Sequence, residues 1–200
     1  MLSKTCPGGI TVSAGYDGEG RLISYARTGE NSLAHVYNGM DYRVATRRGS
    51  DTRRFVYAPD GRVLGEYGNN ANDVKAELIW LSPEVGETGM FGGDDGLGGY
   101  MPLAVAVPNP VAGAGAMQLA WVHARHMGVP IRYSDASGNT LHMPTDYNVP
   151  GFPGQSFTVS DLYYNRYRDY DPLTGRYIQA GLGRWGQPIQ LCHEQSAAVY

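Results

Sequence analysis

The sequence predicts an all-β protein built from antiparallel hairpins, and three observations support this prediction. Turn-forming residues are frequent, with 28 glycines and 12 prolines among 200 residues, as in chains broken by many turns. Fifteen tyrosines stand against four phenylalanines, and tyrosine suits strands that pack one ring face while the hydroxyl meets water or a hydrogen-bond partner. A short motif also recurs with a period of about 20 residues.

The repeated motif contains an aromatic residue, a short polar turn, an arginine and an aliphatic pair. Its copies are Tyr16–Ile23, Tyr37–Val44 and Tyr57–Leu64. Asp and Asn cap such turns and Gly adopts positive φ in them, so each copy predicts strand, tight turn, strand. The flanking strands are expected at 22–25, 35–37, 54–57 and 63–67. One hairpin cannot bury its apolar face alone, so we expect the hairpins to stack into an extended sheet.

The rest of the chain predicts further strands separated by loops. Strands are expected at 77–81, 101–107 and 119–123, with a hairpin turn at 135–139. Glycine-rich residues 86–99 and Pro/Gly/Ala-rich residues 108–116 are expected to form loops. We divide the chain into four regions: hairpins at 1–67, a strand with insertion loops at 68–118, a third region at 119–180, and a tail at 181–200.

Charge and hydropathy exclude several classes of partner. The formal charge is -3 and the pI is about 5.9, so no global field favours nucleic acid or anionic membrane. The basic cluster Arg43, Arg47, Arg48, Arg53 and Arg54 is interpreted as solvated strand and turn positions. The N-terminus lacks the apolar core of a signal peptide, and 101–117 is too short to span a bilayer. We expect no membrane span and, if the chain is expressed alone, a cytoplasmic location.

The two cysteines do not define a site or a cellular compartment. Cys6 and Cys192 are far apart in sequence, and two thiols make neither a disulfide framework nor a four-ligand zinc site. The redox compartment therefore stays open.

Candidate chemical groups are few, and each is interpreted as structural. His123 and His126 form H-x-x-H without further ligands, and Asp94-Asp95-Gly96 lacks the spaced oxygens of a calcium loop. Asp169 and Asp171 would share one strand face, as paired acids for acid–base catalysis could. No G-x-S-x-G nucleophile turn occurs. We therefore expect no enzyme activity, no cofactor, and no catalytic, cofactor-binding or metal-ligating residue.

Several motifs together resemble the RHS-repeat-associated core, the YD-repeat shell of bacterial polymorphic toxins and of teneurin ectodomains. Y-D-x-x-G-R-L occurs at 16–22, and D-A-x-G-N at 135–139. The most distinctive matches are listed here: W-V-H-A-R-H-M-G-V-P at 121–130, F-P-G-Q at 152–155, L-Y-Y-N-R-Y-R-D-Y-D-P at 162–172 and T-G-R-Y-I-Q at 174–179.

This resemblance implies an antiparallel hairpin meander that forms part of a β-shell wall. The implied function is that of a structural fragment of an encapsulating shell associated with polymorphic toxin delivery and interbacterial competition. The implied partners are the rest of the shell, an enclosed C-terminal toxin and a secretion apparatus, with full-length relatives secreted or at the cell surface. Two alternatives stay open: a self-cleaving core protease region, and a cell-surface carbohydrate-binding β module.

The end of the chain departs from the family pattern. After Gln179-Ala180 the expected Asp-Pro and Gly-Gly-x-Asn are missing, which removes the motifs of the self-cleavage site that the resemblance implies. The linker at 140–151 is also shortened. Residues 184–195 read R-W-G-Q-P-I-Q-L-C-H-E-Q, and a one-base shift of their codons permits the family-like G-G-D-N-P-Y-S-Y-A-M-N. The hypothesis is a frameshift, and we expect a dispensable, disordered tail.

Overall fold

The computed structural model describes residues 2–5, 9–81, 101–109, 111–125, 128–142, 155–157, 162–165, 168–171 and 175–178. All regular secondary structure in these residues is β-strand, which confirms the predicted all-β class. Within this part of the chain, no helix is long and apolar enough to cross a membrane. The chain divides into two compact units, one formed by Met1–Thr52 with Ser160–Tyr200 and the other by Arg53–Val159.

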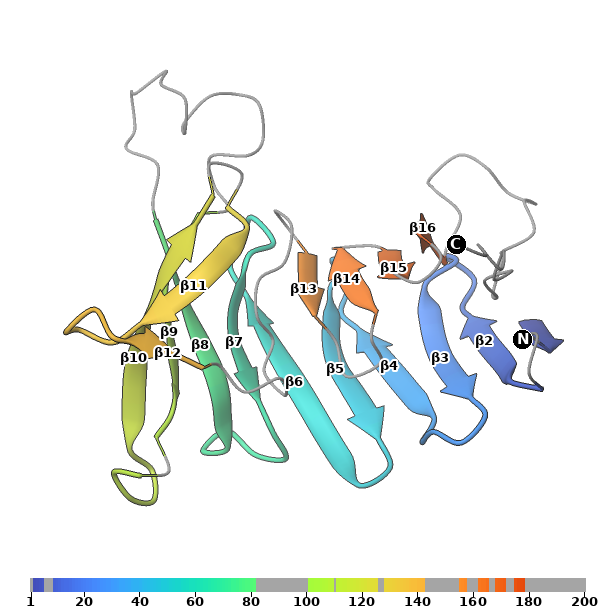
Figure 1. The fold of residues 1–200 in the computed structure, drawn as a ribbon. Helices are drawn as coiled ribbons and strands as arrows, with labels where there is room; N and C mark the ends of the chain where they lie inside the picture. Colours follow the sequence, from blue (N-terminus) through green and yellow to red (C-terminus); the bar gives the residue numbers. More distant parts are fainter. Residues whose placement is uncertain are drawn as a thin grey trace, which may run out of the picture. The chain divides into compact units, whose positions relative to one another are not determined.

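The larger sheet has its strands in chain order from β1 to β12 (Figure 1), which confirms the predicted hairpin meander. The first unit contains β1 (Leu2–Thr5), β2 (Thr11–Tyr16), β3 (Leu22–Arg27), β4 (Leu33–Tyr37), β5 (Arg43–Arg48), β14 (Tyr163–Asn165), β15 (Arg168–Asp171) and β16 (Arg176–Tyr177). Strand β6 (Asp51–Tyr57) begins at the boundary. The second unit continues with β7 (Val63–Tyr67), β8 (Val74–Trp80), β9 (Pro102–Pro108), β10 (Met117–Ala124), β11 (Pro130–Ser134), β12 (Thr140–Leu141) and β13 (Gln155–Phe157).

The three repeats form the same hydrogen-bonded turn. In the first, the Asp17 amide donates to the Arg21 carbonyl and the Gly20 amide donates back to the Asp17 carbonyl, both at 3.1 Å. The same two bonds recur in the second and third repeats, where they start from Asn38 and Ala58. The fifth residue of each repeat has positive φ: 78° at Gly20, 64° at Asp41 and 91° at Gly61. The tight turn predicted in each of the three repeats is thereby confirmed.

A register shift accompanies each repeat at its tyrosine. The strand pairing shifts between Gly15 and Tyr16, between Val36 and Tyr37, and between Val56 and Tyr57. A bulge bends the strand and increases its twist. Each repeat therefore contributes a bulge and a turn at fixed spacing, and together these set the register of its hairpin.

The predicted strands are found close to their expected positions, whereas strands β1 and β13 were not predicted. The segments expected at 77–81, 101–107 and 119–123 correspond to β8, β9 and β10. The turn at 135–139 closes through a bond from the Gly138 amide to the Asp135 carbonyl. Strand β1, which pairs with β2 from Leu2 to Thr5, carries no repeat motif. The expected loop at 86–99 and the expected tail at 181–200 lie outside the described residues.

Each unit has its own apolar core. In the first unit, Val12, Ala14 and Leu22 cluster with Leu162 and Ile178. In the second unit, the cluster contains Val63, Ala76, Leu78, Val105 and Val107 from the three successive strands β7, β8 and β9. The first cluster is the more informative for function, because it joins hairpin residues to residues about 150 positions later in the chain.

We predict that Gly20→Ala lowers the free energy of unfolding by about 1 kcal/mol, because an L-residue is strained at positive φ. A Cβ at Gly20 would meet nothing within 4 Å, so the expected loss comes from backbone strain alone. Urea unfolding measures it. Gly18→Ala is the matched control, since Gly18 lies in the same turn, has open space and lacks positive φ. Equal effects of the two substitutions would contradict the prediction.

Candidate functional site: a buried clamp on the closing segment

The candidate site lies in the first unit, where a late segment of the chain packs on the repeat hairpins. We call residues 162–178 the closing segment. Its strands β14, β15 and β16 pair antiparallel, with Tyr164 opposite Asp169 and Tyr170 opposite Tyr177. The rings of Tyr170 and Tyr177 meet edge to face, with centroids 5.5 Å apart. This contact between Tyr170 and Tyr177 helps to hold β15 and β16 together.

Apolar contacts attach both ends of the closing segment to the hairpins. Leu162 and Ile178, each 3% exposed, belong to the same core cluster as Val12, Ala14 and Leu22. The Tyr16 hydroxyl donates a 3.0 Å hydrogen bond to the Ile178 carbonyl. Tyr16 is the aromatic residue of the first repeat, so a recurring position of the repeat pattern directly holds the closing segment.

A buried ion pair fixes the middle of the closing segment. Arg43 Nη1 donates to Asp169 Oδ1 at 2.7 Å, and the two side chains are 1% and 0% exposed. The Arg43 guanidinium also stacks on Tyr164, with its central carbon 3.9 Å from the ring centroid. The Tyr164 hydroxyl accepts a 3.0 Å hydrogen bond from the Arg43 amide. We call Arg43, Tyr164 and Asp169 the clamp.

Burying two charges makes the clamp energetically costly to form, and it also makes the clamp specific for one arrangement of the strands. Removing two ions from water costs several kcal/mol per ion, which only close pairing and additional hydrogen bonds offset. The aromatic face and the short charge-assisted bond provide such compensation for Arg43. A clamp of this kind selects one arrangement of the strands, because any other arrangement would leave a buried charge without its counterion.

His35 lies in the same buried cluster. Its Nδ1 is 3.0 Å from Thr46 Oγ1 on the neighbouring strand, while its buried Nε2 has no hydrogen-bond partner among the described residues. Burial, assisted by the positive charge of Arg43, lowers the pKa of His35 to about 3. The imidazole is therefore neutral at pH 7, and protonating it would place a second positive charge next to the clamp.

Two half-buried tyrosines, Tyr16 and Tyr37, serve as neutral hydrogen-bond donors near the clamp. Burial, with a smaller contribution from the charge of Asp169, raises the pKa of Tyr16 far above its usual value. Burial likewise raises the pKa of Tyr37, whose hydroxyl donates to the Leu22 carbonyl at 2.9 Å. Both hydroxyls keep their protons under all ordinary conditions, so they act as structural donors here.

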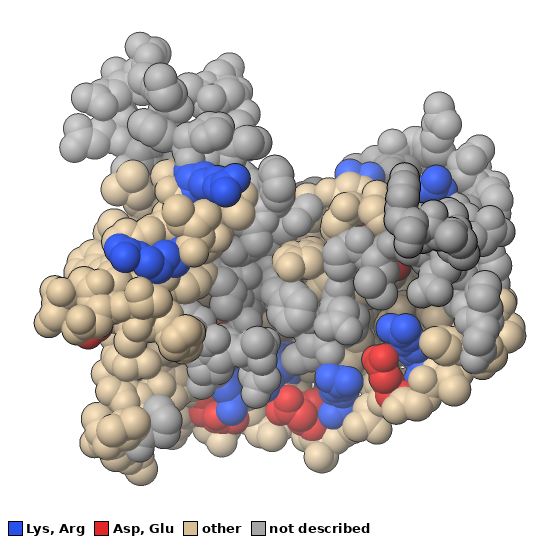
Figure 2. Space-filling view, in the orientation of Figure 1, with Lys and Arg blue, Asp and Glu red and all other residues tan. Residues whose placement is uncertain are grey.

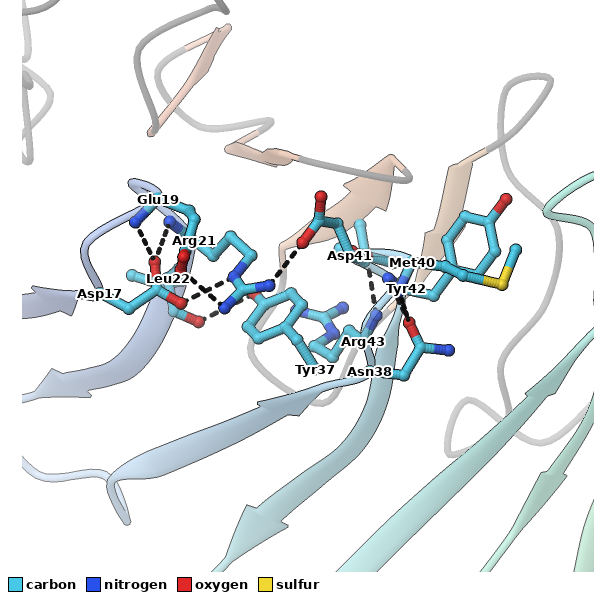
Figure 3. A network of polar contacts seen from close by, with 11 residues as sticks. Asp17, Glu19, Arg21, Leu22, Tyr37, Asn38, Met40, Asp41, Tyr42 and Arg43 are labelled. Carbon is cyan, nitrogen blue, oxygen red and sulfur yellow. Dashed lines mark hydrogen bonds and ion pairs between the residues drawn. The ribbon is translucent and has the colours of Figure 1, made fainter.

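The arginine of the first repeat ties two successive turns together (Figure 3). Arg21 donates to Asp17 Oδ2 at 2.7 Å and to Glu19 Oε2 at 2.9 Å, and it also bonds Asp41 in the second repeat. Its guanidinium lies 5.1 Å from the Tyr37 ring centroid. Partial burial acts to raise the pKa of Asp17, but the hydrogen bonds from Arg21 lower it overall. This network holds the second turn, and Arg43 follows that turn by two residues.

The structure corrects one interpretation of the basic cluster. Arg43 is not a solvated strand position, because it is 1% exposed and paired with Asp169. Arg47 and Arg54 are exposed, and Arg53 pairs with the buried Glu66 at 3.0 Å. Local charge density could not distinguish Arg43 from its neighbours, since its counterion lies 126 positions away.

The other residues singled out in the sequence do not converge on a catalytic arrangement within the described residues. His123 Nε2 lies 2.9 Å from Ser134 Oγ across two paired strands, while its H-x-x-H partner His126 and the acids Asp94 and Asp95 lie outside those residues. Asp169 is engaged by Arg43. The described residues contain no group of three or more His, Cys, Asp or Glu side chains arranged to hold a metal ion.

We predict that Asp169→Asn lowers the free energy of unfolding by about 3–5 kcal/mol, because Arg43 would remain buried without its counterion. Combining Arg43→Met with Asp169→Leu should restore most of that loss, since both charges are then removed. Urea unfolding of the three proteins measures both effects. Glu30→Gln is the control, because Glu30 is 3.7 Å from Arg27 in a partly exposed pair of small expected value. A double variant as unstable as the single one would contradict this account.

Stability should also depend on the protonation of His35. Its folded-state pKa of about 3 lies below the unfolded value of about 6.5, so the unfolded chain binds the proton more readily. The stabilisation that comes from keeping His35 neutral in the folded state is complete above pH 6.5. It is lost as the pH falls toward 3, and the free energy of unfolding then decreases by at most about 1.4 kcal/mol per pH unit. Urea unfolding between those pH values should show a steeper fall for the wild type than for His35→Gln, and parallel curves would exclude this linkage.

Comparisons with known proteins agree with the sequence motifs and the fold. No family model matches the chain. The toxin protein Tse5 of Pseudomonas aeruginosa is 38% identical over 93 residues, an alignment that covers 39% of this chain and 7% of that protein. The chain therefore spans only a small part of the length of this relative.

Two solved structures share the fold. The crystal structure of TcdB2-TccC3-TEV matches with a TM-score of 0.50 and 15% identity over 84% of this chain. A Tc holotoxin pore of Photorhabdus luminescens with a TccC3 variant matches with a TM-score of 0.51 and 18% identity over 86% of this chain. This chain covers 9% of each of those chains. The Tse5 match and this shared fold agree with the resemblance to the RHS/YD-repeat family that the repeats and the closing-segment motif indicate.

Proposed function

We propose that this chain forms part of the wall of an RHS/YD-repeat shell that encloses a toxin during delivery in interbacterial competition. The observation that carries the proposal is the clamp, because it anchors a late segment of the chain on early hairpins through a buried ion pair. A wall that encloses a cargo needs such a fixed closure. The matches to a toxin protein and to components of a toxin assembly support the same role.

The arrangement of charge supports a structural role. Figure 2 shows several basic side chains beside acidic ones along the lower part of the visible face, and Arg21, Arg53 and Arg62 each form ion pairs. Such pairing opposes the single-sign surface that nucleic-acid binding requires. We therefore propose that the partners are protein: the remainder of the shell, an enclosed C-terminal toxin and a secretion apparatus, with the assembled protein secreted or at the cell surface.

The contacts of two acids support a non-catalytic role. Asp169, one of the two acids that could serve acid–base chemistry, gives Oδ1 to Arg43 at 2.7 Å. Asp171 lies opposite Arg176 in the β15–β16 pairing. Using Asp169 in catalysis would take its carboxylate away from the buried Arg43 guanidinium and leave that guanidinium unpaired. We infer that these acids stabilise the closing segment.

Protease protection tests the proposal. The encoding DNA is sequenced with its flanks, and the longer product that contains this region is expressed with its C-terminal extension. We expect trypsin to digest that extension at least about tenfold more slowly in the intact protein than in isolation, since access would require opening the wall. Asp169→Asn should remove most of the protection.

Other outcomes would point elsewhere. Equal digestion of the extension with and without the shell would refute the enclosing role. A discrete C-terminal fragment released on expression, and lost on substitution of Asp171, would favour the self-cleaving alternative. Retention of the protein on a glycan array without any protection of the extension would favour the carbohydrate-binding alternative.

A further inference from the structure

One face of the sheet in the Arg53–Val159 unit is apolar and exposed. Ala104 of β9 pairs with Ile79 of β8 on one side and with Trp121 of β10 on the other. Residues paired across antiparallel strands project to the same face. The opposite face carries the buried Leu78 and Val105 of the core. Ile79, Ala104 and Trp121 therefore belong to the face that the core does not use.

This face presents a continuous apolar surface. Ile79 is 44% exposed, and Leu119 and Trp121 are each 38% exposed. Ala104, the small residue paired with both Ile79 and Trp121, is only 1% exposed. Ala106 pairs with Leu119 in the adjacent row. We call Ile79, Ala104, Ala106, Leu119 and Trp121 the apolar face; contiguous exposed apolar surface of this kind typically marks an interaction site.

Opposite charges stand at opposite borders of the apolar face. Glu77 of β8 pairs with Ala106, which places it at one border. Arg132 of β11 pairs with His123, two residues beyond Trp121 on the same side of β10, which places it at the other border. Neither charge forms an ion pair with a described residue: Glu77 accepts a 2.8 Å bond from the Tyr67 hydroxyl, and Arg132 approaches His123 Nε2 at 3.4 Å.

We propose that the apolar face is a self-complementary interface for a second copy of this chain. The two sheets face each other, and the twofold axis lies between them, parallel to both. When this axis is perpendicular to the line from Glu77 to Arg132, the Glu77 border of one copy lies over the Arg132 border of the other. Glu77 of one copy then meets Arg132 of the other, and the contact occurs twice. The apolar side chains between these borders face one another, as in face-to-face sheet packing.

This arrangement differs from association through strand edges. An unpaired edge can recruit chain after chain, which gives open-ended aggregates. A twofold face-to-face contact closes at two copies. The inference does not depend on the proposed enclosing role, and either can fail without the other.

Sedimentation velocity of the full 200-residue chain over a wide concentration range tests the proposal. We expect a monomer–dimer equilibrium that weakens at high salt. Glu77→Arg and Arg132→Glu, taken singly, should each raise the dissociation constant by roughly tenfold or more, because like charges then face each other at two places. The double reversal should restore the constant to within about threefold of the wild type, because it recreates both pairs with exchanged signs.

Arg47→Glu is the matched control, because Arg47 is an exposed arginine in the other unit, and it should leave the dissociation constant unchanged. Circular dichroism establishes that every variant is folded. A chain that stays monomeric at all concentrations, or forms only open-ended aggregates, would overturn the proposal. So would a folded double variant whose dimer is as weak as those of the single variants. If a single variant does not fold, the salt dependence of the wild-type dimer and the double variant decide.

Discussion

Burying the Arg43 guanidinium is tolerable only if a counterion, an aromatic face and fixed geometry are all present, and the closing segment supplies the first two. Asp169 provides the carboxylate at 2.7 Å and Tyr164 provides the ring. The same segment fills the hairpin core with Leu162 and Ile178. Packing of the first unit therefore depends on a contact between residues 126 positions apart. The apolar contacts and the ion pair both require the closing segment to be docked, so they form and break together.

The three repeats show how one local motif serves different purposes. Each places an arginine just after a turn with the same two backbone hydrogen bonds. Arg62 pairs with its own Asp60, whereas Arg21 reaches from its own turn to Asp41 in the next repeat. Arg43 turns to the closing segment instead. The motif fixes where the arginine starts, and the tertiary surroundings decide which carboxylate it meets.

Local features of this fold were predictable from the sequence, and the long-range contact was not. Turn residues and alternating apolar positions predicted the hairpins, because both act within a few residues. Strand β1 was missed because Leu2–Thr5 carries no such signal. The clamp was missed because Arg43 looks like its basic neighbours until Asp169 is placed beside it, and no local pattern encodes a pairing over that separation. The sequence did not indicate the low pKa of His35 either, because that pKa arises from burial in the folded structure.

Register links the local and long-range parts of the structure. A slip of one residue in β5 would move Arg43 to the opposite face of the sheet, away from Asp169. Such a slip is opposed locally, because the shift at Tyr37 and the turn from Asn38 fix how β4 pairs with β5. It is opposed globally, because a displaced Arg43 would leave Asp169 buried without its partner. The repeat therefore aligns the clamp, and the clamp in turn penalises every register except the one that the repeat specifies.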